Sequence, residues 1–182
     1  MILDEFMSAW QFRERHTSRI AAPPARVFAA IKNVRASEIF LFKTLTWIRR
    51  GGRNIPESIL NAGDDAPLLN VATRSGFIYL ADDAPRELVV GTVVIAPPGI
   101  DCVTTPQMFT TTLAPGYALA AMNFLVTPDG SNGSLVSTET RVFANSPSAQ
   151  RRFARYWRLI YPGSAFIRRM WLRAVKKRAT RG

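Results

Sequence analysis

The spacing of apolar and polar residues along the first part of the chain predicts one strand followed by two helices. Phe12 to Ile20 alternates weakly between apolar and polar residues, as a half-buried strand does. Pro24 to Ile31 carries apolar side chains at helical spacing behind a proline that suits the first turn of a helix. Ala36 to Ile48 predicts a second helix that ends before Gly51 and Gly52, whereas residues 53–70 support no assignment.

The middle of the chain predicts antiparallel strands joined by turns. Residues 75–95 hold two apolar runs on either side of a turn at residues 82–85, which predicts a hairpin. Residues 96–117 are rich in proline and glycine and predict a loop, with one short strand at Phe109 to Leu113. Ala118 to Val126 and Leu135 to Phe143 predict a second hairpin, closed by the turn sequence PDGSNGS.

The register of this second hairpin follows from the position of its turn. A turn centred near Ser131 pairs Phe124 with Thr138 and Met122 with Thr140. One face of the hairpin then carries no charge, and we expect it to be buried. That face comprises Ala120, Met122, Phe124, Val126, Val136, Thr138, Thr140 and Val142, and the opposite face includes Glu139 and Arg141.

The C-terminal part of the chain predicts one long helix. Asn145 or Ser146 can cap it, and Pro147 suits its first position. Apolar residues recur at the same helical spacing before and after Pro162, and they fall on one common face. This favours one kinked helix over two separate helices. From Ser148 to Arg178 such a helix would be roughly 46 Å long.

This helix has an apolar face and a basic face. The apolar face carries Phe153, Tyr156, Trp157, Ile160, Ile167, Trp171, Ala174 and Val175, and the basic face carries Arg151, Arg155, Arg158, Arg169, Arg173 and Lys176. Pro162 falls on the basic face, whereas Gly163 and Ser164 fall on the apolar face. Because Gly163 and Ser164 lack bulk, we expect the space beneath the helix to be widest near the kink. A larger residue at Ser164 should then cost little stability.

Charge and composition locate the basic character of the chain in this helix. The net charge is +11, and 12 of the 24 Lys and Arg residues lie after Glu139, where none of the 13 acidic residues lies. A length of 182 residues suits one domain, residues 1–182, with residues 1–10 as a lead-in and residues 148–179 as the basic helix. No apolar run has the length of a transmembrane helix, the N-terminus lacks the basic region of an export signal, and one cysteine suits a reducing compartment. We therefore expect a cytoplasmic protein.

Four segments resemble the START-like superfamily, also called SRPBCC. They are IAAPPARVFAAI (20–31), APRELVVG (84–91), STETRVFA (137–144) and YWRLIYPGSAFIRRMWLRAVKKRA (156–179). The last two are the most specific and are similar to an uncharacterised bacterial group of this superfamily, which also contains polyketide cyclases and dehydratases. The resemblance implies an α+β helix-grip fold, in which a curved antiparallel sheet with two short helices holds a long C-terminal helix across its concave face. It also implies a cavity between sheet and helix for an apolar or amphipathic small molecule.

The side chains that carry most enzyme chemistry are few and scattered. His16 is interpreted as a partly exposed strand side chain, and Cys102 as a thiol without a neighbouring base. Glu139 and Arg141 are interpreted as a surface ion pair, and the acid pairs at residues 64–65 and 82–83 as parts of loops. With one histidine and one cysteine, no metal site is expected, and no phosphate-binding or dinucleotide-binding motif indicates a cofactor.

Three functions remain open from the sequence. The first is a binding or carrier protein for an apolar or amphipathic small molecule, lipid-like or polyketide-like. The second is a cyclase-type or dehydratase-type enzyme that uses the same cavity. The third is a module that docks on an anionic membrane surface through its basic helix; nucleic acid is disfavoured because the aromatic residues face away from the basic ones. The residues expected to bind the ligand are Met122, Phe124, Thr138, Thr140, Trp157, Ile160, Ser164 and Ile167.

Overall fold

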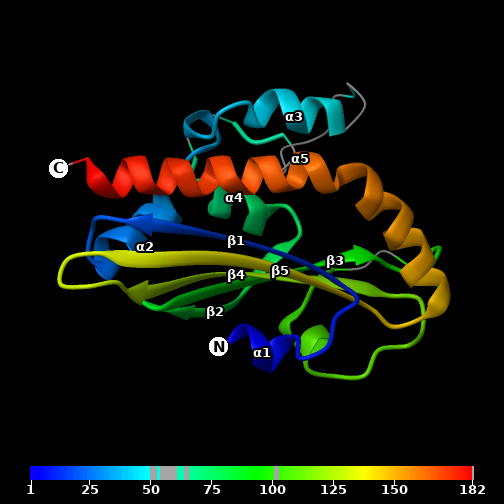
Figure 1. The fold of residues 1–182 in the computed structure, drawn as a ribbon. Helices are drawn as coiled ribbons and strands as arrows, with labels where there is room; N and C mark the ends of the chain where they lie inside the picture. Colours follow the sequence, from blue (N-terminus) through cyan, green and yellow to red (C-terminus); the bar gives the residue numbers. More distant parts are fainter. Residues whose placement is uncertain (50–52, 54–60, 64–65, 101–102, 182) are drawn as a thin grey trace.

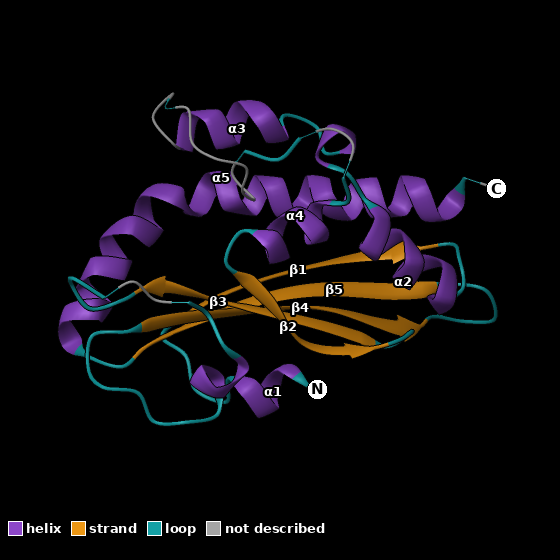
Figure 2. Cartoon of the chain, turned by 180° about the vertical axis from the view of Figure 1, so that it is seen from behind, coloured by secondary structure: helices purple, strands orange, loops and turns teal. Residues whose placement is uncertain are grey.

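A five-stranded antiparallel sheet with a long helix across one face organises the molecule. The structure is a computed structural model that describes residues 1–49, 53, 61–63, 66–100 and 103–181. The strands are β1 (Phe12–Ile20), β2 (Phe77–Asp83), β3 (Glu87–Ile95), β4 (Ala118–Pro128) and β5 (Ser134–Ala144), in the spatial order β1–β5–β4–β3–β2. Helix α5 (Pro147–Thr180) lies across the sheet (Figures 1 and 2). This is the α+β helix-grip fold predicted from the sequence.

The β4–β5 hairpin has the predicted register. Phe124 pairs with Thr138 and Met122 pairs with Thr140, as the position of the turn implies. On the face toward α5, which we call the inner face, Met122, Phe124 and Thr138 are buried, as expected for an uncharged strand face. The predicted hairpin between β2 and β3 is also present, with its turn at residues 84–86.

The opposite, outer face of the sheet is also covered, which the sequence did not lead us to expect. The short helix α1 (Leu3–Phe6) and the 3-10 turn η2 (Pro106–Phe109) pack on it. The predicted strand at Phe109 to Leu113 is wrong, because Phe109 ends this turn and its ring packs against the outer face. Gly91 allows the close approach, since a Cβ atom at Gly91 would lie 2.5 Å from the Phe109 ring.

Helix α5 is continuous through its internal proline, as the unbroken apolar stripe predicted. Ser146 caps its first turn, because its Oγ accepts a hydrogen bond of 3.2 Å from the amide of Ala149. Pro162 lies inside the helix, and the ribbon bends in the half that precedes the straight C-terminal part (Figure 1). A proline removes one helical hydrogen bond and crowds the preceding turn, which accounts for a bend there. In the straight part, the Trp171 ring packs on Phe124 of the sheet, with 5.1 Å between centroids.

Shorter helices complete the α5 side of the sheet. Helix α2 (Pro24–Asn33) begins at the predicted proline, and α4 (Leu68–Arg74) overlaps the end of residues 53–70, which supported no assignment. The helix expected over Ala36 to Ile48 is instead two pieces, the 3-10 turn η1 (Ala36–Glu38) and α3 (Phe42–Arg49). Leu41, at a φ of 56°, separates the two pieces because its backbone leaves the right-handed helical region. Helix α3 contacts α5 on the side away from the sheet (Figures 1 and 2).

Candidate functional site

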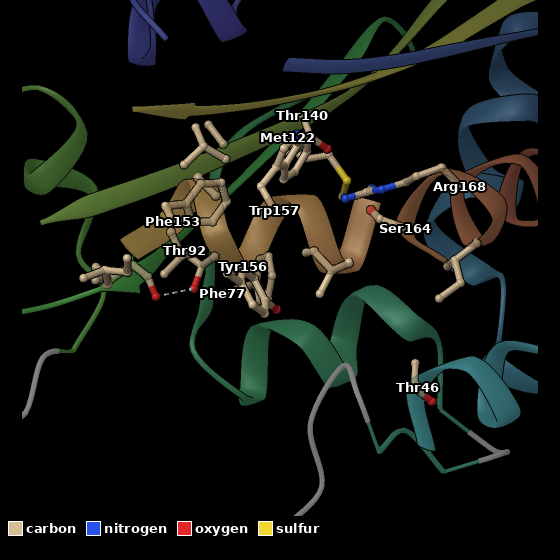
Figure 3. Close-up of a pocket in the computed structure, with 18 of the residues that line it drawn as sticks. Thr46, Phe77, Thr92, Met122, Thr140, Phe153, Tyr156, Trp157, Ser164 and Arg168 are labelled. Carbon is tan, nitrogen blue, oxygen red and sulfur yellow. Dashed lines mark hydrogen bonds between the residues drawn. The ribbon is translucent and has the colours of Figure 1, made fainter. Parts of the chain in front are cut away.

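A cavity of about 490 Å³ lies between the inner face of the sheet and α5. This volume falls within the roughly 300–1,000 Å³ that is typical of small-molecule sites. Strands β3, β4 and β5 form its floor, and α5 contributes residues on both sides of Pro162, from Arg152 to Trp171. Phe42 and Thr46 of α3 reach the same cavity from beyond α5 (Figure 3). The cavity therefore lies where the bent helix spans the sheet.

The walls of the cavity are mainly aromatic and aliphatic. Phe153, Tyr156 and Trp157 of α5 all line the cavity (Figure 3). The ring centroids of Phe153 and Trp157 lie 5.7 Å apart, and Phe12 of β1 lies 4.9 Å from Phe153. Such spacings are typical of packed aromatic clusters, which hold a wall rigid.

The structure brings most of the predicted ligand-binding residues to this cavity. Those that line it are Met122, Thr140, Trp157, Ile160, Ser164 and Ile167. Phe124 and Thr138 do not line it, because Trp171 covers Phe124 and both residues are buried beneath the C-terminal half of α5. Whether the lining residues bind a ligand stays a prediction.

Sequence reasoning missed several lining residues on other elements. Thr92 to Ile95 of β3 and Phe77 of β2 line the cavity, although they were assigned only to strands. The apolar run in GTVVI (residues 91–95) is the sequence feature that could have indicated that β3 forms part of the cavity floor. Phe42 and Thr46 line it only because α3 folds back over α5, and no periodicity in the chain predicts that contact.

Ser164 lines the cavity, and its hydroxyl is also bonded to a buried carboxylate. Its Oγ donates a hydrogen bond of 3.1 Å to Oε2 of Glu14, a carboxylate that is 4% exposed. The other oxygen of Glu14 lies 2.7 Å from Nε2 of His16, whose side chain is partly exposed, as predicted. A bulky residue at Ser164 would remove one of the groups that stabilise this buried carboxylate, which adds a cost that the size of Ser164 alone did not indicate. The expected low cost stays a prediction.

The polar and charged atoms along the cavity are few. Arg152 and Arg168 are its charged residues, and no acidic residue lines the part of the cavity that the structure describes. The guanidinium carbon of Arg168 lies 5.7 Å from the centre of the Trp171 ring, and the Arg168 side chain extends toward Met122 (Figure 3). Among the described residues, the buried indole Nε1 of Trp171 has no hydrogen-bond partner, and neither has the buried Oγ1 of Thr138. Buried donors of this kind are uncommon in native proteins.

A second cluster of charged residues lies on the outer face, outside the cavity. Arg13 forms two hydrogen bonds with the carboxylate of Glu139, at 2.9 and 3.0 Å, and Arg141 forms a third at 2.7 Å. Nη1 of Arg141 also reaches Asp4 and the carbonyl of Met7, each at 2.8 Å. Glu139 and Arg141 are 2% and 3% exposed, so their interpretation as a surface ion pair is wrong. The N-terminal segment covers them.

The charged environment of Glu139 determines its protonation. Burial on its own would raise the pKa of the Glu139 carboxyl, but the hydrogen bonds and positive charges of Arg13 and Arg141 outweigh burial. The pKa of Glu139 therefore lies below its ordinary value, and the residue is a carboxylate at neutral pH. Glu87, fully buried nearby, accepts hydrogen bonds from the amides of Ile2 and Leu3 and from Asn123. These contacts attach α1 to the sheet.

Other sequence expectations concern residues away from the cavity. Asp82 and Asp83 are the last two residues of β2 and pair with β3, so the expectation that they lie in a loop is wrong. The carboxylate of Asp83 pairs with Arg86 at 2.6 Å. Cys102 and the acid pair at residues 64–65 lie outside the described residues. Within the described ranges no cluster of histidine, cysteine and acidic residues could hold a metal ion, and none of the helices there combines the length and apolarity needed to cross a bilayer.

Comparison with known proteins gives similarity at the level of the fold. No family model and no curated protein matches the chain. Protein MLL2253 from Mesorhizobium loti is 11% identical with a TM-score of 0.45, over 93% of this chain and 98% of that chain. TTHA0849 from Thermus thermophilus is 13% identical with a TM-score of 0.35, over 92% and 97% of the two chains. CalU16 from Micromonospora echinospora is 14% identical with a TM-score of 0.32, over 93% and 94%. Similarities this low assign neither a ligand nor an activity.

Proposed function

We propose that this protein is a cytoplasmic START-like binding or carrier protein for an apolar or amphipathic small molecule, held between α5 and the sheet. The observation that carries the proposal is the cavity of about 490 Å³ with its aromatic and aliphatic walls. A cavity of this size and lining favours apolar ligands, because transfer of apolar surface from water contributes about 25 cal/mol per Å². The sequence segments shared with the START-like superfamily, and with its bacterial group in particular, support the same proposal.

The proposal is tested by filling the cavity from α5. Ile160 lines the cavity, whereas its neighbour Leu159 does not line it and is 82% exposed. Ile160→Trp should abolish uptake of a neutral fluorescent probe such as Nile red, and Leu159→Trp should bind the probe as the wild type does. Circular dichroism of both variants checks that the fold is kept. Equal binding by Ile160→Trp and the wild type would contradict the proposal.

An enzyme of the cyclase or dehydratase kind would use the same cavity and is the weaker alternative. The ionisable side chains among the described lining residues are Arg152, Tyr156 and Arg168, and none is a carboxylate or an imidazole. Glu14 and His16 lie behind Ser164, engaged with each other at 2.7 Å. General acid–base catalysis usually needs a group within hydrogen-bond reach of the substrate. Mass spectrometry of the small molecules that co-purify with the protein separates the alternatives, because a lipid favours a carrier and a cyclised polyketide favours an enzyme.

Contact with an anionic membrane is a second candidate function. It is supported by exposed basic and apolar side chains on α5 and α3. The predicted basic face of α5 is exposed at Arg151, Arg155, Arg158, Arg169, Arg173 and Lys176. Beside these cations, Leu159 is 82% exposed, and Trp47 of α3 is 52% exposed. Exposed aromatic and aliphatic groups among cations suit the interface of an anionic bilayer. A carrier that loads from such a membrane would combine the two functions.

A further inference from the structure

The hydroxyl of Thr140 differs from those of the other threonines in the cavity wall. Thr92 donates its hydroxyl proton to the carbonyl of Gly76, at 2.9 Å. Thr46 likewise donates to the carbonyl of Phe42, at 2.9 Å. Thr140 lines the cavity from β5 and is only partly buried, and its Oγ1 has no hydrogen-bond partner among the described residues (Figure 3). Its hydroxyl is therefore available to a bound molecule.

Ser164, on the opposite wall, offers the cavity a hydrogen-bond acceptor and no donor. Its single hydroxyl proton is directed to Oε2 of Glu14, 3.1 Å away, and an ionised carboxylate can only accept. The lone pairs of the Ser164 oxygen remain for a partner on the cavity side. A ligand group that binds to Ser164 must therefore donate a hydrogen bond.

Glu14 brings the hydroxyls of Thr140 and Ser164 to the same region of the cavity. In the register between β1 and β5, Glu14 is the direct partner of Thr140. Residues directly opposite each other on one face of an antiparallel pair have Cβ atoms about 4.5–5.5 Å apart. The hydrogen bond from Ser164 ends on the same Glu14 side chain. A donor for Ser164 and an acceptor for Thr140 are thus needed in one place, and a ligand hydroxyl provides both.

From this arrangement we propose that the cavity binds an amphiphile with a neutral hydroxyl head. The ligand O–H donates to Oγ of Ser164, and the ligand oxygen accepts the hydroxyl proton of Thr140. The proposal rests on the proposed carrier function and narrows its ligand class to alcohols with a long alkyl chain or a ring system. A site built to hydrogen-bond a hydroxyl discriminates against analogues that lack it, because its own polar groups are then left unpaired. The apolar part of the alcohol extends along Phe153 and Trp157.

The buried carboxylate of Glu14 disfavours an anionic head at this position. A ligand carboxylate has no proton to donate to Ser164, and beside Ser164 it would lie about 6 Å from the Glu14 carboxylate, the length of two successive hydrogen bonds. Glu14 is 4% exposed, and like charges repel more strongly away from water. Arg168 also lines the cavity, but it already has an interaction partner in the protein and is not needed to bind a hydroxyl.

Competition for bound Nile red tests the proposal with the full chain. Decanol, methyl decyl ether and decanoate share an alkyl chain and differ in the head group. Decanol should compete at concentrations roughly tenfold or more below the other two. The reason is that the ether oxygen accepts from Thr140 but donates nothing to Ser164, and that decanoate is opposed by Glu14.

Three variants assign the two hydrogen bonds. Ser164→Ala should remove the preference for decanol over the ether, because it removes the acceptor that only decanol uses. Thr140→Val keeps the shape of the side chain and should weaken decanol several-fold. Thr46→Val is the matched control, because the Thr46 hydroxyl lies in the same cavity wall but is bonded to the backbone. Circular dichroism checks the fold of each variant, and if Ser164→Ala does not fold, the comparison of Thr140→Val with Thr46→Val decides.

The outcomes separate this proposal from the proposed function. Equal competition by decanol and the ether, or a preference that survives Ser164→Ala, overturns the hydrogen bond to Ser164. Equal weakening of decanol in Thr46→Val and Thr140→Val overturns the bond to Thr140. Stronger competition by decanoate than by decanol overturns the neutral head, and all these results leave a carrier of another ligand class. If neither Nile red nor any of the three compounds binds, the carrier function itself fails.

Discussion

Nε of Arg141 donates a hydrogen bond of 2.7 Å to Oε1 of Glu139, two residues earlier on the outer face of β5. Both side chains are almost completely buried, and Arg13 holds the same carboxylate from the neighbouring strand. The pair is therefore part of a second interior layer between the sheet and the N-terminal segment. Its energetics differ from those of an exposed ion pair, where solvent screens most of the attraction.

Arg141→Met should lower the free energy of unfolding by about 1–3 kcal/mol, because Glu139 and the carbonyl of Met7 lose a buried hydrogen-bond donor while Arg13 still pairs with Glu139. Asp83→Asn provides the control, since it breaks an exposed pair with Arg86 and should change stability little. Urea denaturation of both variants measures the difference. Similar, small effects in both would mean that the outer-face cluster contributes no more than a surface pair.

The lowered pKa of Glu139 makes part of the stability depend on pH. The folded pKa lies below that of the unfolded chain, so the stabilisation is complete above the unfolded pKa of about 4.3 and is lost as the pH falls through the folded pKa. The difference in unfolding free energy between the wild type and Glu139→Gln should therefore be largest near neutral pH and shrink on acidification. Denaturation curves from about pH 7 to pH 3 measure this difference. A difference that stays constant over this range would contradict the shift.

Two glycines should respond to alanine in opposite directions. Gly163 lies inside α5 and a Cβ there meets nothing within 4 Å, so Gly163→Ala should stabilise the protein by about 0.5–1 kcal/mol. Gly91→Ala should destabilise it by about 1–3 kcal/mol, because the new Cβ would lie 2.5 Å from the Phe109 ring. Thermal melting of the two variants gives both signs. A loss of stability at Gly163 would show that the space beside it is needed.

Ser164→Ala should lower the free energy of unfolding by about 1–3 kcal/mol, because Glu14 loses a hydrogen-bond donor in a buried position. Ser148→Ala is the control, since Ser148 is exposed in the first turn of the same helix. Chemical denaturation compares the two. An unchanged stability in Ser164→Ala would imply that water replaces the hydroxyl at Glu14.

Vesicle sedimentation tests whether the basic face of α5 binds anionic membranes. The double variant Arg155→Glu/Arg158→Glu should bind anionic vesicles several-fold more weakly than the wild type, and wild-type binding should fall steeply with salt. Arg19→Glu is the control, because Arg19 is similarly exposed but belongs to β1. Equal binding of the wild type to neutral and anionic vesicles would contradict membrane binding through these arginines. Their role would then be only to keep this face of the helix in contact with water.

Local sequence patterns predicted most of the helices and strands. The composition of the cavity lining, in contrast, depends on contacts between segments that are far apart in the sequence. Met122 and Thr140 could be paired from a turn sequence, and the phase of the apolar stripe carried α5 correctly through Pro162. In contrast, Phe42 reaches the cavity only after α3 folds over α5, and the burial of Arg141 depends on residues more than a hundred positions away. The periodicity of apolar residues predicts which face of a helix or strand is buried, but it does not predict which segment of the chain packs on that face. For the same reason a charged strand face was interpreted as exposed.

The attachment of α1 to the outer face has a consequence for how the molecule is made. The amides of Ile2 and Leu3 bind Glu87, and the carbonyl of Met7 is bound by Arg141, so these early residues find their partners only after residues 87 and 141 have been synthesised. Strand β1 likewise pairs with β5, the last strand of the sheet. Contacts between residues so far apart in sequence slow folding, because a long loop must close before they form. A nascent chain therefore leaves β1 unpaired until Ser134–Ala144 have been synthesised, and it is in this interval that β1 depends most on protection from aggregation.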